Sequence, residues 1–396
     1  MRIAMVSEHA DPLAAIGGVD AGGQNVHVAG LATALAALGH EVTVYTRRTA
    51  RGQDAPVPLA PGAVVEHVPA GPPEPLPKDA LPPHMPAFAA WLARRWGRER
   101  PDVAHAHFWM SGMAALNAAT WLGVPVVQTF HALGTVKRRW QGAADTSPPE
   151  RLAVERDIGR RAAAIIATCT DEVRELVAMG VPPERVTVVP CGVDLALFRP
   201  DGPAARPAGQ QVLSIGRLVP RKGVDTVIEA LPRVPEARLI VAGGEPGDAE
   251  WLRLRALASA SGLAGRVRLI GSVARADVPA LMRSVRVVVT VPWYEPFGMV
   301  PVEAMACGVP VVASAVGGHL DTVTGCGVLV PPRRPRAVAK ALRDLLGCPE
   351  RRAALAAAGL RRARTRYGWP QVAARTESVY RSLAGMSTGR LATAEG

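Results

Sequence analysis

The residues that can do chemistry gather in four short segments, and the most informative covers residues 294–314. It holds two glutamates eight residues apart, Glu295 in an expected loop and Glu303 on a helix expected to begin near Gly298. Carboxylates accept charged hydrogen bonds from sugar hydroxyls, and the free N–H groups at a helix N-terminus favour phosphates. The segment therefore indicates a site for a ligand that joins sugar to phosphate. A surface acid on a helix is the alternative for Glu303.

A glycine-flanked basic loop forms the second segment. Arg217 and Lys222 stand five residues apart beside Gly216 and Gly223, after an expected strand at 212–215. Glycines let a ligand approach the backbone closely, so both cations can reach one phosphate group. Two cations there would stabilise the charge that grows on a departing diphosphate. Solvated basic residues on a loop are the alternative.

The third segment is a glycine-rich turn, residues 17–25, between the first expected strand and the first expected helix. Free N–H groups at a helix start favour an anion, and Gly22 and Gly23 stand at that point. The turn lacks the G-x-G-x-x-G spacing of dinucleotide-binding folds, which argues against a nicotinamide cofactor. A tight turn without a ligand is the alternative.

The fourth segment, residues 128–139, places His131 at the end of an expected strand. A basic run of Lys137, Arg138 and Arg139 follows it. Strand ends in open parallel sheets line the ligand crevice, so His131 is expected to project toward the second domain. A purely structural histidine is the alternative.

Short apolar runs that alternate with helical segments must position these residues. In the first half the runs are 3–6, 42–46, 103–107, 124–129, 164–168 and 186–189. In the second half they are 212–215, 239–242, 267–270, 285–289 and 309–313. This pattern predicts an α/β fold with two parallel sheets covered by helices.

The chain of 396 residues is longer than one hydrophobic core usually serves. A stretch rich in proline, glycine and alanine follows Phe198 and has the composition of a linker. We therefore predict one domain at 1–198 and a second at 199–369, followed by a last helix at 370–386.

Composition argues against several classes of protein. No apolar run approaches the ~18 residues of a membrane helix, and Glu8 comes too early for a signal peptide, so we expect a cytoplasmic protein without membrane association. The 5 cysteines are scattered, which argues against disulfides and a cysteine metal site. The net charge is +12, but only 4 of the 46 basic residues are lysines. We attribute this arginine bias to GC-rich coding and expect no nucleic-acid partner.

Together these residues resemble the large group 1 family of retaining glycosyltransferases. Within it they are similar to the branch that holds sucrose-phosphate synthase and the inositol-phosphate N-acetylglucosaminyltransferase of mycothiol synthesis. The most specific part is the Glu295 to Glu303 segment with Phe297 and Gly298 inside it. The resemblance implies the GT-B fold, in which two Rossmann-like domains face each other across a cleft and the last helix returns to the first domain. The first domain would bind the acceptor and the second the nucleotide sugar.

The resemblance also implies roles for individual residues. Donor binding would fall to Gly22, Gly23, Gly216, Arg217, Lys222, Glu295, Phe297, Gly298, Met299, Val300 and Glu303. Glu303 would hold the ribose hydroxyls and Glu295 those of the transferred sugar. Arg217 and Lys222 would hold the diphosphate, and His131 would lie near the reacting carbon, so that these two cations, Glu295 and His131 form the catalytic set. Such enzymes proceed by front-face displacement with retention, and the resemblance implies no metal and no cofactor beyond the donor.

Acceptor binding would fall to Asn25, Lys78, Phe108, Ala132 and Arg151. In the inositol-phosphate branch the phosphate pocket includes an aromatic hydroxyl, a threonine after the histidine, a lysine and a downstream arginine. This chain keeps Lys78 but has Phe108 and Ala132 at the hydroxyl positions, and its arginine position aligns with Leu152 beside Arg151. We therefore predict transfer of a hexose or N-acetylhexosamine from a UDP-sugar to a cyclitol or natural-product intermediate, with GDP as the alternative nucleotide.

Other functions remain open at this point. The first is the inositol-phosphate N-acetylglucosaminyltransferase of mycothiol synthesis, and the second is a binding protein that holds a nucleotide sugar without turnover. An epimerase or inverting transferase is disfavoured, because neither is expected to combine the Glu295 and Glu303 helix with the Arg217 and Lys222 loop. Attachment to a membrane for lipid glycosylation is a further alternative, and a homodimer is compatible with all of these.

Overall fold

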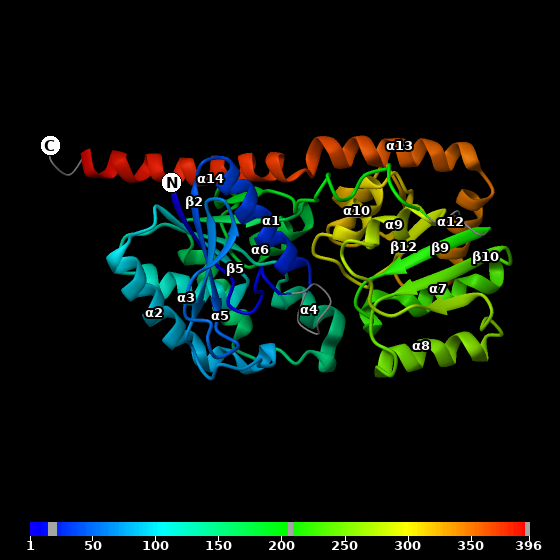
Figure 1. Cartoon of the computed structure of the whole chain (residues 1–396), viewed down its shortest axis with the longest axis horizontal. Coiled ribbons are helices and arrows are strands. Elements are labelled where there is room, and N and C mark those ends of the chain that lie inside the picture. Colours follow the sequence, from blue (N-terminus) through cyan, green and yellow to red (C-terminus); the bar gives the residue numbers. More distant parts are fainter. Residues whose placement is uncertain (15–21, 205–208, 393–396) are drawn as a thin grey trace. The chain divides into compact units, whose positions relative to one another are not determined.

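The computed structural model describes residues 1–14, 22–204 and 209–392, with side chains described as far as residue 383 (Figure 1). The chain forms two compact units. Unit 1 comprises Met1–Pro190 and Trp369–Gly396, and unit 2 comprises Cys191–Gly368. Each is a layered α/β structure built on a mainly parallel sheet, so the predicted fold class is confirmed.

The sheet of unit 1 has the strand order β3-β4-β2-β1-β5-β6-β7-β8, parallel throughout except between β3 and β4. Its strands are β1 (Arg2–Val6), β2 (Glu41–Arg47), β3 (Val57–Ala60), β4 (Ala63–Val68), β5 (Val103–His107), β6 (Val126–Thr129), β7 (Ala164–Ala167) and β8 (Val186–Val188). Each apolar run predicted in this half is a strand. The β3 and β4 hairpin was not predicted, and its first strand β3 is only four residues long, includes a proline and has no fully buried residue.

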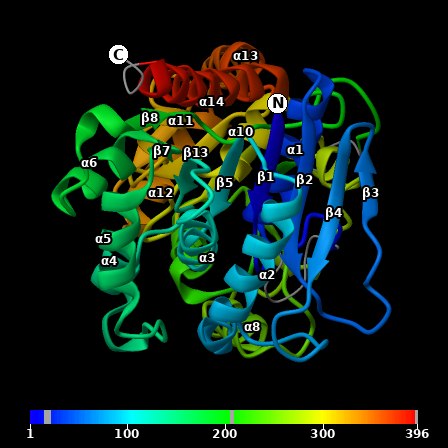
Figure 2. The ribbon, with the colours of Figure 1, turned by 90° about the vertical axis from the view of Figure 1, so that its left-hand side faces the viewer.

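The helices of unit 1 cover both faces of this sheet. They are α1 (Gly23–Ala37), α2 (Met85–Arg98), α3 (Trp109–Ala119), α4 (Gly134–Gln141), α5 (Arg151–Arg161), α6 (Thr170–Ala178) and α14 (Trp369–Ala392). Successive residues of a strand point to opposite faces, and β1 shows this: Val6 packs with α2 and α3, whereas Met5 packs with α1 and α14. Figure 2 shows α2 and α3 in front of the sheet.

The last helix returns to unit 1, where the predicted helix at 370–386 is part of the longer α14. Tyr380 of α14 is buried, and its hydroxyl lies 2.6 Å from Nδ1 of His105 on β5. A Cβ atom on Gly30 of α1 would come within 2.2 Å of the Trp369 indole ring. Only glycine therefore allows α1 and α14 to pack this closely.

The sheet of unit 2 is parallel, with the strand order β11-β10-β9-β12-β13-β14. Its strands are β9 (Gln210–Ile215), β10 (Ala237–Ala242), β11 (Val267–Leu269), β12 (Val287–Thr290), β13 (Val311–Ser314) and β14 (Val328–Val330). The chain runs outward from β9 to β11 and returns to pair β12 with β9. Ligands of open parallel sheets bind at the strand ends where the order reverses, which in this unit is between β9 and β12.

The helices of unit 2 are α7 (Val224–Ala230), α8 (Ala249–Ala260), α9 (Val278–Arg283), α10 (Met299–Ala306), α11 (His319–Val323), α12 (Pro335–Leu346) and α13 (Pro349–Arg366). Residues 191–198, which the sequence assigned to the first domain, belong to unit 2. Val193 and Phe198 are buried in its core, and the Val193 amide donates to the Tyr367 carbonyl over 2.7 Å. In the described part of the chain, no helix is long and apolar enough to cross a bilayer.

Candidate active site

A small pocket of unit 2 opens at the C-terminal ends of β9, β10 and β12. Its lining includes Ser214, Gly216, Arg217, Lys222, Ala242 and Thr290. Gly243 has φ +123°, and a Cβ atom there would lie 1.9 Å from the Gly216 carbonyl oxygen, so glycine is needed where these two loops touch. The structure thus brings Arg217 and Lys222 to one pocket at the point where the strand order reverses.

Lys222 joins this pocket to the loop that holds Glu295. The Lys222 ammonium donates to Glu295 Oε2 over 2.5 Å. Burial opposes ionisation of Glu295, but Lys222, His319 and Arg221 together outweigh it and hold the pKa of Glu295 at about 2. Burial lowers the pKa of Lys222, and Glu295 partly offsets that effect. The arrangement is an ion pair that a charged ligand can enter and rearrange.

The start of α10 depends on two glycines that sit against Glu295. Gly298 precedes the helix with φ +92°, and a Cβ atom there would lie 2.5 Å from the His319 ring. A Cβ atom on Gly317 would lie 2.0 Å from the Glu295 carbonyl oxygen. Phe297 is buried against the Tyr367 ring, with ring centroids 5.9 Å apart.

Met299 and Val300 are the first two residues of α10, and both are partly buried against the core of unit 2. Their position places the free N–H groups of the helix start beside Glu295, where they can donate to a phosphate. The predicted donor residues from 295 to 300 therefore form one continuous loop-to-helix segment.

Glu303 lies on α10 and is almost fully buried. Its carboxylate accepts a hydrogen bond from Arg275 over 2.5 Å, and the Arg275 guanidinium lies 4.5 Å from the centroid of the Phe198 ring. Burial raises the pKa of Glu303, although Arg275 opposes the shift. Arg275 was not singled out in the sequence, because it follows β11 in a loop without a recognisable motif.

His319 is a second residue of unit 2 that the sequence reasoning missed. It is fully buried, its Nδ1 donates to the Ser314 carbonyl over 3.0 Å, and burial lowers its pKa to about 4. It stands at the start of α11, directly after Gly317 and Gly318. A glycine pair between a strand and a helix also precedes α1, and that repeated pattern is the signal that could have found it.

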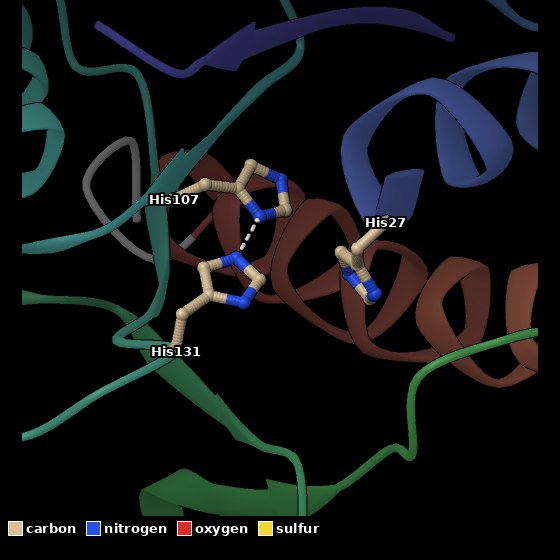
Figure 3. Close-up of side chains that lie close together, drawn as sticks. All are labelled: His27, His107 and His131. Atoms are coloured by element: carbon tan, nitrogen blue, oxygen red, sulfur yellow. Dashed lines mark hydrogen bonds between the residues drawn. The ribbon is translucent and has the colours of Figure 1, made fainter. Parts of the chain in front are cut away.

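In unit 1, His131 follows β6 with φ +59°, a backbone conformation that is strained for a residue other than glycine. Its Nε2 lies 3.0 Å from Nδ1 of His107, which ends β5 (Figure 3). The two rings are stacked, with centroids 5.2 Å apart. His27 of α1 approaches from a third element, with its ring centroid 5.1 Å from that of His131. Strained backbone of this kind gathers at functional sites.

These imidazoles are neutral near pH 7. Burial lowers the pKa of His27 to about 4 and that of the neighbouring His105 to about 3. Burial, with the neighbouring imidazoles, also holds the pKa of His107 and His131 well below the ordinary value. A neutral His131 can donate or accept a hydrogen bond but cannot serve as a general acid at neutral pH.

The sequence reasoning singled out His131 and missed His27 and His107. The signal available for His107 was its place two residues after His105 in an apolar run, since alternate residues share one face of a strand. Nothing comparable marked His27, which looks like any polar residue of an amphipathic helix.

Lys78 and Arg151, two of the residues expected to bind the acceptor, lie against the ring of a third, Phe108, which caps α3 with φ +83°. The Lys78 ammonium lies 5.5 Å from the centroid of the Phe108 ring, and the Arg151 guanidinium lies 5.0 Å from it. Arg151 also donates to the Ala132 carbonyl over 2.5 Å. Arg151 therefore supplies a guanidinium beside Phe108, although the family's arginine position aligns with Leu152.

The charge of Arg151 is compensated within unit 1. Its Nε donates to Glu155 over 2.7 Å, and both side chains are buried. Glu155 also accepts from the Gly134 amide over 2.9 Å. Burial raises the pKa of Glu155, with Arg151 opposing the shift. Arg151 thus contributes hydrogen-bond donors more than net charge.

Asn25 ties the start of α1 to a neighbouring loop. Its side-chain amide donates to the Asp11 carbonyl over 2.8 Å, and its carbonyl oxygen accepts from the Gly22 amide over 3.0 Å. Gly23 begins the helix. The rest of the glycine-rich turn, residues 17–21, lies outside the described residues.

Two further polar residues adjoin Phe108 and were not predicted. The His9 ring meets the Phe108 ring edge-on, with centroids 4.9 Å apart. His9 Nδ1 donates to the buried Glu8 carboxylate over 2.6 Å, and Glu8 also accepts from Ser111. This pair offers a hydroxyl-bearing ligand a polar partner beside the ring.

Two family profiles match the chain. The family described as Glycosyltransferase Family 4 matches residues 21–197, and the one described as Glycosyl transferases group 1 matches residues 203–362. The chain is also 40% identical over 403 residues to the D-inositol 3-phosphate glycosyltransferase of Xylanimonas cellulosilytica, with 96% of each chain covered. It is 39% identical to the protein of that name in Kineococcus radiotolerans, covering 96% of this chain and 95% of the relative.

Solved structures resemble the chain over almost its whole length. The sucrose-phosphate synthase of Thermosynechococcus elongatus matches with a TM-score of 0.89 and 31% identity, covering 98% of this chain and 100% of the other. HepE of Anabaena, solved in complex with UDP and glucose, matches with a TM-score of 0.76, covering 96% of this chain and 100% of the other. At 21% identity, the second likeness concerns the fold alone.

Proposed function

The chain belongs to the group 1 glycosyltransferase family and has the GT-B fold, and from that premise we propose that it moves a hexose or N-acetylhexosamine from a nucleotide diphosphate sugar to a small polar acceptor with retention of configuration. UDP is the expected nucleotide, with GDP as the alternative. The observation that carries the proposal is the grouping of Arg217, Lys222 and Glu295 at the reversal of the unit 2 sheet.

The donor half of the proposal rests on charge. Arg217 and Lys222 would hold the diphosphate, whose negative charge increases as the sugar leaves. Glu295, freed from Lys222 by the incoming phosphate, would accept hydrogen bonds from the sugar hydroxyls, and Glu303 would accept those of the ribose. The N–H groups at the start of α10 would add donors to the phosphates.

The transfer step needs no protein nucleophile. The bond between the anomeric carbon and the leaving phosphate oxygen breaks, and a bond to the acceptor oxygen forms on the same face of the sugar. The acceptor proton passes to the departing phosphate oxygen. His131 would act as a neutral hydrogen-bond partner of the sugar, which agrees with its lowered pKa.

For the acceptor we propose a cyclitol or another polyhydroxylated intermediate without phosphate. Phe108 and Ala132 offer no hydroxyl donors, and Glu155 compensates the charge of Arg151. His9 and Glu8 provide the polar partners that hydroxyl groups need.

D-inositol 3-phosphate is the second candidate acceptor, and one observation favours it. Lys78 and Arg151 both lie against the Phe108 ring, which gives a phosphate two cationic partners. The relatives named D-inositol 3-phosphate glycosyltransferase point the same way.

The donor is tested by a thermal-shift screen of the purified protein against UDP, GDP, ADP and TDP and their common sugars. A ligand that binds only the folded state raises the melting temperature. We expect stabilisation by UDP and its sugars, and loss of that stabilisation in Lys222→Ala. If no nucleotide stabilises the protein, the donor site as proposed is wrong.

The acceptor is tested by incubating the protein with the stabilising nucleotide sugar and either D-inositol 3-phosphate or unphosphorylated cyclitols. Products are followed by mass spectrometry, and the anomeric configuration by NMR. Strong turnover of D-inositol 3-phosphate would exclude the first acceptor and establish the second. Binding of the donor without consumption in any reaction would favour a non-catalytic binding protein.

A further inference from the structure

Three histidines of unit 1 converge although the proposed function uses only one of them. His27 comes from α1, His107 from the end of β5 and His131 from the residues after β6. One ring nitrogen from each lies within 4.8 Å of those of the other two, and the nitrogens of His107 and His131 are 3.0 Å apart (Figure 3). His27 lies on a helix and His107 ends a strand, and such elements hold side chains more firmly than a flexible loop would.

Two ring nitrogens in this cluster are buried without a partner among the described residues. They are Nδ1 of His27 and Nε2 of His107. His27 is 4% exposed and His107 is fully buried. A buried polar atom left unsatisfied is costly and calls for an explanation. A ligand at Nδ1 of His27 would satisfy the first of these atoms, whereas Nε2 of His107 would carry the ring proton when Nδ1 of that ring binds the ligand.

We propose that His27, His107 and His131 form a binding site for a divalent zinc-like ion. Zinc binds imidazole nitrogens at about 2.1 Å, and two ligands of a tetrahedral ion are then roughly 3.4 Å apart. Nδ1 of His107 and Nε2 of His131 need to separate only slightly to reach that spacing. His27 closes the remaining distance by rotation of its side chain.

The donor set determines which ions fit. Zinc, cobalt, nickel and copper ions accept imidazole ligands, whereas magnesium and calcium require oxygen. The cluster offers nitrogen alone. Three histidines leave a fourth position open, as in zinc sites that bind water or another ligand.

Occupation of this site would change the chemistry of His131. Its Nε2, which meets Nδ1 of His107 in this structure, would hold the ion instead, and the ring would be fixed to the ion rather than free to orient toward the sugar, so zinc would inhibit transfer. This consequence rests on the proposed function, whereas the metal site itself stands on the geometry of the three imidazoles.

The site is tested on the full-length chain without a histidine tag, titrated with Co²⁺ as a spectroscopic probe. We expect one equivalent to bind, with the visible absorption of a four-coordinate ion, and Zn²⁺ to displace it. His27→Gln should weaken binding by about tenfold or more, since even loss of a residue behind a metal ligand has effects of that size. His84→Ala, which removes a histidine outside the cluster, should bind Co²⁺ like the parent chain.

Two results would contradict the proposed metal site. One is Co²⁺ binding of unchanged affinity in His27→Gln, and the other is no binding of Co²⁺ or Zn²⁺ by the parent protein. If His27→Gln does not fold, X-ray absorption of the zinc-loaded parent protein decides, because fewer than three imidazole ligands contradict the proposal. If the protein binds Co²⁺ but transfers no sugar, the metal site stands and the proposed function is wrong. If it transfers sugar but binds no Co²⁺ or Zn²⁺, the proposed function stands and the metal site is wrong.

Discussion

The two units build their candidate sites from opposite kinds of groups. In unit 2, charges are paired: Lys222 with Glu295, and Arg275 with Glu303. In unit 1, the groups nearest His131 are neutral imidazoles that burial prevents from ionising. Both sites lie at strand ends of parallel sheets, so the fold alone does not explain the difference.

This difference indicates which unit can rearrange its ion pairs when the charge of a bound ligand changes. Ion pairs in unit 2 can exchange partners when a diphosphate arrives and when its charge grows. Neutral rings in unit 1 can hold hydroxyl groups in place without competing for protons. On the proposed function, stabilisation of the departing charge therefore belongs to unit 2, whereas both units hold hydroxyl groups, unit 2 through Glu295 and Glu303 and unit 1 through His131.

The largest expected effect comes from removing the central cation of unit 2. Lys222→Ala takes away a donor to the departing diphosphate and leaves Glu295 buried without its partner, so kcat should fall roughly 10²–10³-fold. Steady-state consumption of the donor sugar measures this. Lys340→Ala is the matched control, because that lysine of the same unit is exposed and pairs only with Asp344. Equal activity of the two variants would remove Lys222 from the mechanism.

The next effect concerns the second ion pair of unit 2. Glu303→Ala leaves Arg275 uncompensated and should lower the free energy of unfolding by about 2–3 kcal/mol. The full cost of breaking a buried pair is not expected, because the Arg275 side chain is 23% exposed. Calorimetric unfolding measures the change. Asp344→Ala breaks an exposed pair instead and should lower the free energy of unfolding much less.

Acidification should destabilise unit 1 more than unit 2. The pKa of His27 is about 4 and that of His105 about 3, below the ordinary value of 6.5. Below pH 6.5 the unfolded chain therefore binds protons that folded unit 1 excludes, and the free energy of unfolding falls by up to ~1.4 kcal/mol per pH unit per imidazole. This loss continues until the pH reaches the lowered pKa of each group.

Unit 2 responds differently over the same range. The low pKa of Glu295 gives stability that is present above its ordinary value of 4.5 and is lost only as the pH falls toward about 2. Among the described histidines of unit 2, His319 alone is available to destabilise it between pH 6.5 and 4.5. Hydrogen exchange at pH 7, 6 and 5 should show protection lost faster in unit 1. Equal loss in both units would contradict the contrast drawn between their sites.

The smallest expected effect restores a hydroxyl to unit 1. Phe108→Tyr adds a donor beside Lys78 and Arg151, and a hydrogen bond to a charged phosphate should raise kcat/KM for D-inositol 3-phosphate by about tenfold. Unphosphorylated cyclitols serve as the comparison and should change less. An equal gain for both acceptors would show that the hydroxyl does not act through phosphate.

Much of the fold was predictable because buried parallel strands leave apolar runs in the sequence. The predicted runs became strands, and the last helix expected at 370–386 is part of α14. The domain boundary was placed by the linker composition after Phe198, but burial decides it, and Phe198 packs in unit 2. Composition reports flexibility of the chain and carries no information about the core against which a residue packs.

The candidate site was predictable where glycines and charges recur at short spacing. Arg217, Lys222 and Glu295 were found in this way, and the structure brings them together. Arg275 and His27 were missed, because each meets its partner through the fold and stands in no local motif. Arg151 was named for the acceptor site although the family's arginine position aligns with Leu152, and the structure shows its guanidinium against the Phe108 ring.

The return of α14 to unit 1 has a consequence for synthesis on the ribosome. The chain leaves unit 1 after Pro190, builds all of unit 2 and re-enters unit 1 at Trp369. Unit 2 is therefore continuous and can fold as it emerges, whereas unit 1 lacks the Tyr380 hydroxyl that meets His105 until nearly the whole protein has been made. The half translated first is the half completed last.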